Sequence, residues 1–122
     1  MSDTQTPRSN ASTIDSRLTP TEIFDLLRDD RRRYILHTLT KRTDAVDLNA
    51  LATAIVQWEQ KMDIRMDNHY ERVVTDLAHH HLPRLLDAEI LVYQHEQETV
   101  TLCDTAISLT PYLELAANAD FN

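Results

Sequence analysis

The 122-residue sequence predicts a mostly helical α+β domain in which amphipathic helices surround a small β-hairpin. Three observations support this class. Apolar residues recur at helical spacing in five segments between residues 19 and 116, two β-branched runs flank a polar turn near residue 97, and residues 1–17 hold almost no large apolar side chain. We therefore expect a disordered tail over residues 1–17, a folded domain over residues 18–104 and a C-terminal helix within residues 105–122.

Composition limits the class of protein further. A hydrophobic share of 42% suits one small core, and no apolar run is long enough to cross a bilayer. Residues 1–17 lack the apolar middle segment of a secretory signal, so we expect a cytoplasmic protein. The single cysteine, Cys103, cannot form an internal disulfide and is expected to be a small hydrophobic residue in a strand.

The charge is unusual for a protein that binds nucleic acid. The formal net charge is -8, and only Lys41 and Lys61 among the 12 basic residues are lysines. Acid excess with arginine in place of lysine indicates a salt-rich cytoplasm. Phosphate contacts depend on cations at ordinary salt but contribute little in molar salt, so a DNA-binding protein of this composition would depend on base contacts and DNA shape.

Capping signals place the first two helices. Thr19, Pro20 and Glu22 form a capping-box pattern that begins a helix. Asp29 and Asp30 end that helix or cap a second one over residues 31–42. The side chains expected in the core are Ile23, Phe24, Leu26, Leu27, Ile35, Leu36 and Leu39.

Four arginines, Arg28, Arg31, Arg32 and Arg33, lie at the junction of these helices and form the strongest positive cluster in the chain. They could hold a phosphate or an acidic partner. The neighbouring acids Asp25, Asp29 and Asp30 could equally neutralise them, and we favour this second interpretation because exposed pairs of this kind are common.

The middle of the chain contains a short strand around Val46 and a helix over residues 48–59 that Asp47 caps. Trp58 lies at the edge of the apolar face of this helix, where core packing is favoured over contact with a partner. The connection over residues 60–67 is longer than the tight turn of a minimal helix-turn-helix unit.

The helix over residues 70–86 has two different faces. Its apolar face carries Tyr70, Val73, Val74, Leu77, Ala78, His81 and Leu85, and its polar face carries Arg72, Thr75, Asp76 and His79. Such side chains can bond to base edges in a DNA major groove, although a mixed polar face is also typical of a solvated helix. Pro83 is expected to bend or end this helix near residues 79–82.

Two strands, residues 90–95 and 99–102, flank the turn Glu96–Glu98 and predict a hairpin. The turn is acidic and the chain has no glycine, so we expect this hairpin not to hold the DNA backbone. A last helix begins near Thr110 and Pro111 and either covers its own core or packs against a second copy.

The residues give little sign of catalysis, a cofactor, a small-molecule ligand or a metal. Three consecutive histidines, His79, His80 and His81, point about 100° apart on a helix and cannot share one ion. Asp76 and His80 share a face but lack a further ligand. We find no phosphate-binding glycine loop or nucleophile motif and expect a protein that is not an enzyme.

Several short sequences together resemble a known group of domains. Residues 24–39 (FDLLRDDRRRYILHTL) resemble the opening of ArsR-type winged-helix repressors. The pair Trp58-Glu59 and the sequence His81–Leu85 (HLPRL) are closer to a group of uncharacterised winged-helix domains from halophilic archaea. The resemblance covers residues 19–102, and Glu89 stands where those domains usually carry glycine.

This resemblance implies a winged helix-turn-helix domain with a two-stranded hairpin as the wing and an extra C-terminal helix, acting as a dimeric regulator of transcription that binds double-stranded DNA. The helix over residues 70–86 would enter the major groove. With the helix in that position, we expect Arg72, Thr75, Asp76 and His79 to lie near bases and Arg65, His80 and Arg84 to lie nearer phosphates. The alternative is a protein-interaction module that docks a partner through the acidic hairpin and the arginine cluster.

Overall fold

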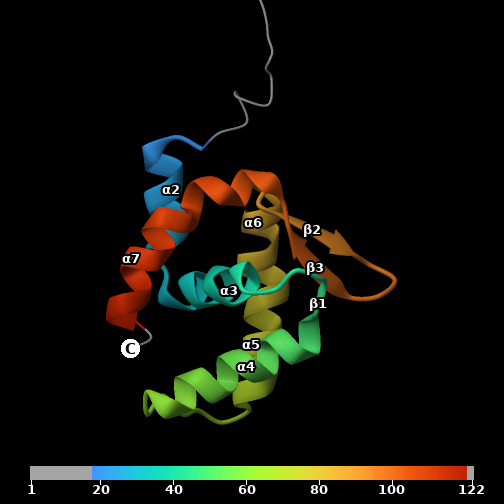
Figure 1. The fold of residues 1–122 in the computed structure, drawn as a ribbon. Helices are drawn as coiled ribbons and strands as arrows, with labels where there is room; N and C mark the ends of the chain where they lie inside the picture. The colour runs from blue at the N-terminus through green and yellow to red at the C-terminus, as the bar shows by residue number, and fades with distance from the viewer. Residues whose placement is uncertain (1–17, 121–122) are drawn as a thin grey trace, which may run out of the picture.

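The computed structural model describes residues 18–120, and the expected tail over residues 1–17 lies outside the described residues. In chain order the elements are α2 (Pro20–Leu27), α3 (Asp30–Thr40), β1 (Val46–Asp47), α4 (Leu48–Lys61), α5 (His69–Asp76), η1 (Leu77–His81), α6 (Leu82–Asp87), β2 (Leu91–Gln94), β3 (Thr99–Leu102), η2 (Asp104–Leu109) and α7 (Thr110–Asp120). Helices dominate, and one small sheet lies at the side of the molecule (Figure 1). The predicted mostly helical α+β class is confirmed.

Capping residues fix where the first helices begin. The Thr19 hydroxyl accepts the Glu22 N–H, and the Glu22 carboxylate accepts the Thr19 N–H at 2.8 Å, so the predicted capping box is present. Asp29 and Asp47 each accept a backbone N–H in the first turn of α3 and α4. These bonds satisfy donors that a helix start otherwise leaves without partners.

The sheet is antiparallel, with strand order β1-β3-β2. β2 and β3 form the predicted hairpin, in which Leu91 lies opposite Leu102. Val46 of β1 lies opposite Val100 of β3, so the short strand before α4 joins the hairpin to the helices. Cys103 lies one residue beyond β3, half-buried, and not within a strand as expected.

The chain takes left-handed backbone without glycine. Glu89, between α6 and β2, has φ 60°, and Glu98, in the hairpin turn, has φ 54°. A left-handed conformation crowds the Cβ atom of any residue other than glycine. Glycine, which the resemblance implies at position 89, would take this conformation without crowding. In this chain glutamate takes it instead.

The segment α5–η1–α6 forms one continuous helical rod over residues 69–87 (Figure 1). Pro83 was expected to bend or end this helix, but the helix continues through a π turn at residues 77–81. There the Leu82 N–H donates to the Leu77 carbonyl, five residues back. Because Pro83 has no N–H to extend the α-helical ladder, the irregular turn lies directly before it.

The rod, α2, α3, α4, the sheet and α7 enclose a single core. Leu113 of α7 is buried, and α7 packs beside α3, so the C-terminal helix covers the core of its own domain. Trp58 is half-buried and stacks on Tyr34 of α3 with ring centroids 4.6 Å apart. The largest fully buried side chains are Ile35, Leu36, Leu51, Ile55, Val73, Leu85, Ile90, Val100 and Leu109.

Three apolar residues that the helical pattern assigned to the core are exposed. Phe24 is 60% exposed and contacts the ring edge of Tyr112 at the surface. Tyr70 lies near the start of the rod, where its hydroxyl donates to the Asn49 side chain. Ala78 lies within the π turn, whose extra residue shifts the faces of the helix. No helix in the described range is both long and apolar enough to cross a bilayer.

Candidate nucleic-acid interface

The rod has one buried face and one open face. Val73, Leu77 and Leu85 are almost completely buried, and Arg72, Thr75 and His79 are exposed. For these residues the division expected from helical spacing is present in the structure. The open face therefore offers a guanidinium, a hydroxyl and an imidazole to a partner.

Two depressions are lined by all the predicted DNA-binding residues except Arg65, and Asp76 and His80 line both. The first, here called the outer groove, has a volume of about 500 Å³ and is lined by Asn68, Glu71, Arg72, Thr75, Asp76 and His80. The second, here called the junction hollow, has a volume of about 750 Å³ and lies between the α2–α3 junction and the second half of the rod. It is lined by Arg28, Asp29, Arg32, Asp76, His79, His80, His81, Arg84 and Asp87.

Backbone carbonyls orient the two arginines nearest the start of the rod. Arg72 Nε donates to the Asp67 carbonyl at 2.9 Å, and Arg65 Nη2 donates to the Gln60 carbonyl at 3.2 Å. Both side chains are exposed. Arg65 lies apart from the other predicted residues, in the connection between α4 and α5.

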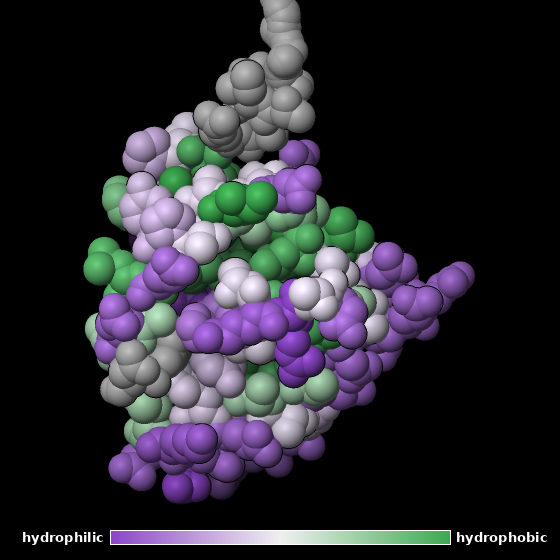
Figure 2. Space-filling model, in the orientation of Figure 1, coloured by the Kyte–Doolittle hydropathy of each residue, from purple (hydrophilic) through white to green (hydrophobic). Residues whose placement is uncertain are grey.

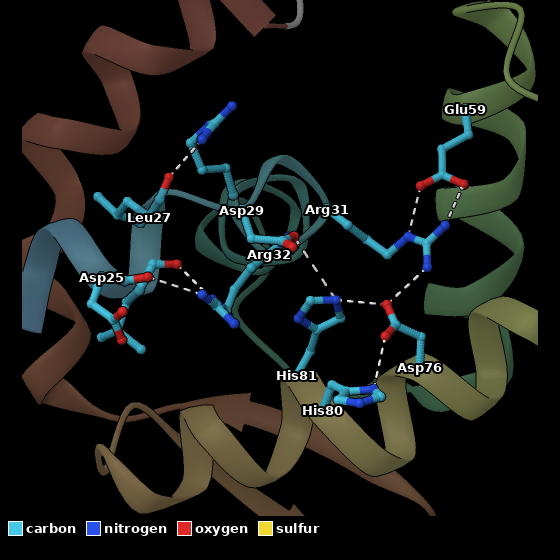
Figure 3. Close-up of polar contacts among 11 residues, drawn as sticks. Asp25, Leu27, Asp29, Arg31, Arg32, Glu59, Asp76, His80 and His81 are labelled. Atoms are coloured by element: carbon cyan, nitrogen blue, oxygen red, sulfur yellow. Dashed lines mark hydrogen bonds and ion pairs between the residues drawn. The ribbon is translucent and has the colours of Figure 1, made fainter.

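A charged network joins the rod to the rest of the domain (Figure 3). Arg31 of α3 donates to both carboxylate oxygens of Glu59 on α4 at 2.7 Å, and its Nη1 donates to Asp76 on α5 at 2.8 Å. The guanidinium therefore links three helices at one point. Local sequence patterns do not reveal this network, because its members lie 28 and 45 residues apart.

Histidines extend the network on both sides. The Nε2 atom of His69 lies 2.8 Å from Glu59 Oε1, and the Nε2 atom of His81 lies 2.7 Å from Asp76 Oδ2. His69 and His81 are both buried. Burial of His81 agrees with its predicted place on the apolar face of the helix. His80 is exposed, and its Nδ1 lies 3.0 Å from Asp76 Oδ1.

The network holds two carboxylates in the charged form. Burial disfavours ionisation of Glu59, but the hydrogen bonds and charges of Arg31 and His69 outweigh it and lower the pKa of this carboxyl. Burial likewise opposes ionisation of Asp76, and Arg31 and His81 together lower its pKa. Both groups therefore remain anionic partners of Arg31.

Asp76 does not lie as the helical spacing implied. Its carboxylate accepts hydrogen bonds from Arg31 and His81 and lies against His80, so its oxygens bind within the domain. Asp76 was grouped with Arg72 and Thr75 as a contact to bases. The structure instead makes it the residue through which the rod is attached to α3.

The four arginines of the cluster bind groups of their own domain, as expected, but three of them bind other groups than the expected neighbouring acids. Arg31 binds Glu59 and Asp76, and Arg32 donates to backbone carbonyls at the end of α2. Arg33 pairs with Asp120 of α7. Arg28 alone pairs with an acid named in the prediction, Asp25, which also pairs with Arg84.

The surface chemistry differs from one part of the molecule to another. The hairpin turn holds Glu96 and Glu98 and no lysine or arginine, and Figure 2 shows hydrophilic side chains at its tip and along α4. Hydrophobic side chains reach the surface in the upper part of the same view, where α2 and α7 lie.

Within residues 18–120, no three His, Cys, Asp or Glu side chains are arranged to hold a metal ion.

Comparison with known proteins identifies a family but no activity. A family model described as a domain of unknown function, DUF7344, matches residues 24–101, and the chain belongs to this family. The match begins within α2 and ends within β3, so it includes the rod, the charged network and both depressions. No curated protein and no solved structure matches the chain.

Proposed function

We propose that the domain is a sequence-specific DNA-binding regulator of transcription and that its elements work as a winged helix-turn-helix unit. The rod over residues 69–87 would lie in the major groove, with the β2–β3 hairpin as the wing. One observation carries this proposal: the rod buries one face in its own core and leaves Arg72, Thr75 and His79 open on the other.

The roles of the open residues follow from their positions on the rod. Arg72, Thr75 and His79 would contact base edges, because they follow one another along its exposed face. Arg65, in the α4–α5 connection, and His80 and Arg84 of the rod would contact phosphates. Asp76 has no part in this contact set, because its carboxylate is bound to Arg31 and His81.

The charged network supports this proposal because a helix that reads bases must be held in a fixed orientation. Arg31 binds Glu59 and Asp76 together, so the rod cannot rotate about its own axis without breaking ion pairs between largely buried side chains. Only base contacts confer sequence preference, and their geometry depends on this attachment.

The acidic composition sets the conditions of binding. With a net charge of -8 and an acidic wing, the protein would be repelled by DNA at low salt. We infer a salt-rich cytoplasm in which this repulsion is screened and base contacts dominate. Selection from a random duplex library in near-molar potassium chloride tests the proposal: one enriched sequence motif is expected, and the absence of enrichment contradicts it.

We also propose that two copies associate through the outer faces of α2 and α7. Phe24 packs edge-on against Tyr112, and Leu115, one turn further along α7, is 74% exposed. A second copy offers an identical apolar patch, and pairing of the two patches would cover both. A dimer would present two rods to two DNA half-sites.

A protein-interaction module is the second candidate function. The specific observation in its favour lies in the connection between α4 and α5, where Met62, Ile64 and Met66 are all exposed. Exposed methionines suit adaptable contacts with a partner protein. Recovery of one stoichiometric protein in high salt, without enriched DNA, would favour this function over the first.

A further inference from the structure

The floor of the junction hollow contains two polar groups with unused hydrogen-bonding capacity. Arg32 is 7% exposed; its Nε donates to the Leu26 carbonyl at 2.6 Å and its Nη2 to the Asp25 carbonyl at 2.9 Å, which leaves Nη1 outside both bonds. His81 is 4% exposed, and its Nδ1 has no hydrogen-bond partner among the described residues. Figure 3 shows the guanidinium of Arg32 and the ring of His81 facing one another.

An unpartnered buried nitrogen of this kind is rare, because leaving it without a hydrogen bond costs free energy. The contact made by the other ring nitrogen, Nε2, indicates whether Nδ1 of His81 donates or accepts a hydrogen bond. Nε2 lies 2.7 Å from the Asp76 carboxylate, which can only accept, so Nε2 carries the proton. In the neutral ring, Nδ1 is then an acceptor. The floor therefore suits a ligand that accepts from Arg32 and donates to His81.

We propose that the junction hollow binds a phosphate group that retains a P–O–H, either inorganic hydrogen phosphate or a phosphate monoester bound as its monoanion, since the second pKa of a monoester is about 6. A phosphate oxygen accepts from Arg32 Nη1, and the P–O–H donates to His81 Nδ1. Planar guanidinium groups match phosphate oxygens well in geometry. Sulfate and the phosphodiesters of DNA have no such proton at neutral pH and satisfy only the arginine.

Two further arginines stand at the rim of the hollow. The side chain of Arg28 is 77% exposed and that of Arg84 is 45% exposed, and both pair with Asp25. Because these side chains are long and in contact with solvent, they can turn towards a ligand and admit it to the buried floor. Arg28, unlike Arg84, is not one of the residues proposed to contact DNA.

Carboxylates also line the hollow, so a surplus of positive charge is not the basis of the proposal. Three aspartates balance the three arginines of the lining. Asp76 is bound to Arg31 behind the floor, and Asp29 accepts the Arg32 backbone N–H as the cap of α3. Selection therefore depends on the directed hydrogen bonds of Arg32 and His81. The proposal does not rest on DNA binding.

The test titrates the full chain with inorganic phosphate, methyl phosphate and sulfate, each at constant ionic strength and neutral pH. Calorimetry gives the Kd, and ¹⁵N NMR of the histidine rings reports on His81. Saturable binding of inorganic phosphate is expected, with a shift at the His81 ring. Sulfate is expected to bind about tenfold more weakly, the factor that corresponds to one hydrogen bond to a charged group.

Two exposed arginines provide a variant and its matched control. Arg28→Gln should raise the Kd for phosphate about tenfold through the loss of one charge-assisted contact. Arg72→Gln changes an arginine outside the hollow and should leave that Kd unchanged. Equal affinity for sulfate, no saturable response at His81, or equal weakening by both variants would overturn the proposal.

The remaining outcomes identify the source of the ligand and separate this proposal from DNA binding. Binding of methyl phosphate supports the site and extends it to monoesters, and binding of inorganic phosphate alone supports it for the free ion. Phosphate binding without an enriched DNA motif would contradict the proposed function and leave this site standing. An enriched motif without phosphate binding would do the reverse.

Discussion

Arg31 and Glu59 form a two-pronged ion pair between α3 and α4, in which the Nε–Oε2 and Nη2–Oε1 distances are both 2.7 Å. The side chain of Glu59 is 6% exposed and that of Arg31 is 16% exposed, so water screens the pair weakly. The same guanidinium binds Asp76 of the rod. The orientation of the proposed DNA-reading helix therefore depends on one residue of another helix.

Replacing Arg31 with methionine should lower the free energy of unfolding by about 3–5 kcal/mol, because it leaves the charge of Glu59 buried without its partner. Urea denaturation at neutral pH measures the effect. The matched control is Arg28→Met, which removes an arginine whose side chain is 77% exposed and should change stability by no more than about 0.5 kcal/mol. Similar losses in the two variants would contradict a structural role for the network.

Stability should fall on the acid side because of Glu59 and Asp76. The pKa of each carboxyl is lowered in the folded state, so the folded state binds fewer protons than the unfolded chain. The stabilisation is complete above the unfolded-state pKa values of about 4.3 and 3.9, and it is lost as the pH falls through the lower folded-state values. Urea midpoints measured against pH should show this decline, and Glu59→Gln should flatten it. An unchanged slope in that variant would be inconsistent with the assignment.

Glu89→Gly should stabilise the domain by about 1 kcal/mol, because glycine relieves the crowding of a left-handed backbone. Glu89 has φ 60°. Thermal or urea unfolding measures the gain. The control is Glu96→Gly, since Glu96 is not among the residues with positive φ and gains only the flexibility of glycine. A loss of stability on Glu89→Gly would show that the side chain makes a contact that outweighs the backbone.

Leu115→Glu should dissociate the proposed dimer, because it places a charge on the apolar face that α7 presents. Sedimentation equilibrium should then report a monomer where the unmodified chain is a dimer. Met62→Glu introduces the same charge at a residue that is 53% exposed in the α4–α5 connection and should leave the dimer intact. A monomeric unmodified chain would rule out association through α2 and α7.

Local signals in the sequence were sufficient to predict the helices and the hairpin. Thr19 and Glu22 identified the start of α2, and the β-branched runs around Val100 identified the hairpin. These features depend on residues within a few positions of one another. The site depended on contacts between distant segments, so Arg31 was expected to pair with nearby acids and not with Glu59 and Asp76.

The π turn explains most of the remaining difference in the rod. Regular helical spacing assumes 3.6 residues per turn throughout, and the widened turn before Pro83 breaks that spacing. Ala78 consequently lies at the surface although the pattern assigned it to the core. The hydrogen-bonding need of His81 Nδ1 was also beyond prediction, because it arises from how Arg32 and Asp76 lie around that ring.

Placement of the rod in the major groove can be tested by DNA selection with Arg72→Ala in near-molar potassium chloride. The comparisons are the unmodified chain and Arg42→Ala, an exposed arginine outside the rod. If Arg72 contacts a base edge, its loss should relax the preference at one position by about 1–3 kcal/mol and leave the other positions of the motif unchanged. Arg42→Ala should select the unmodified motif. An identical motif from all three proteins would contradict placement of the rod in the major groove.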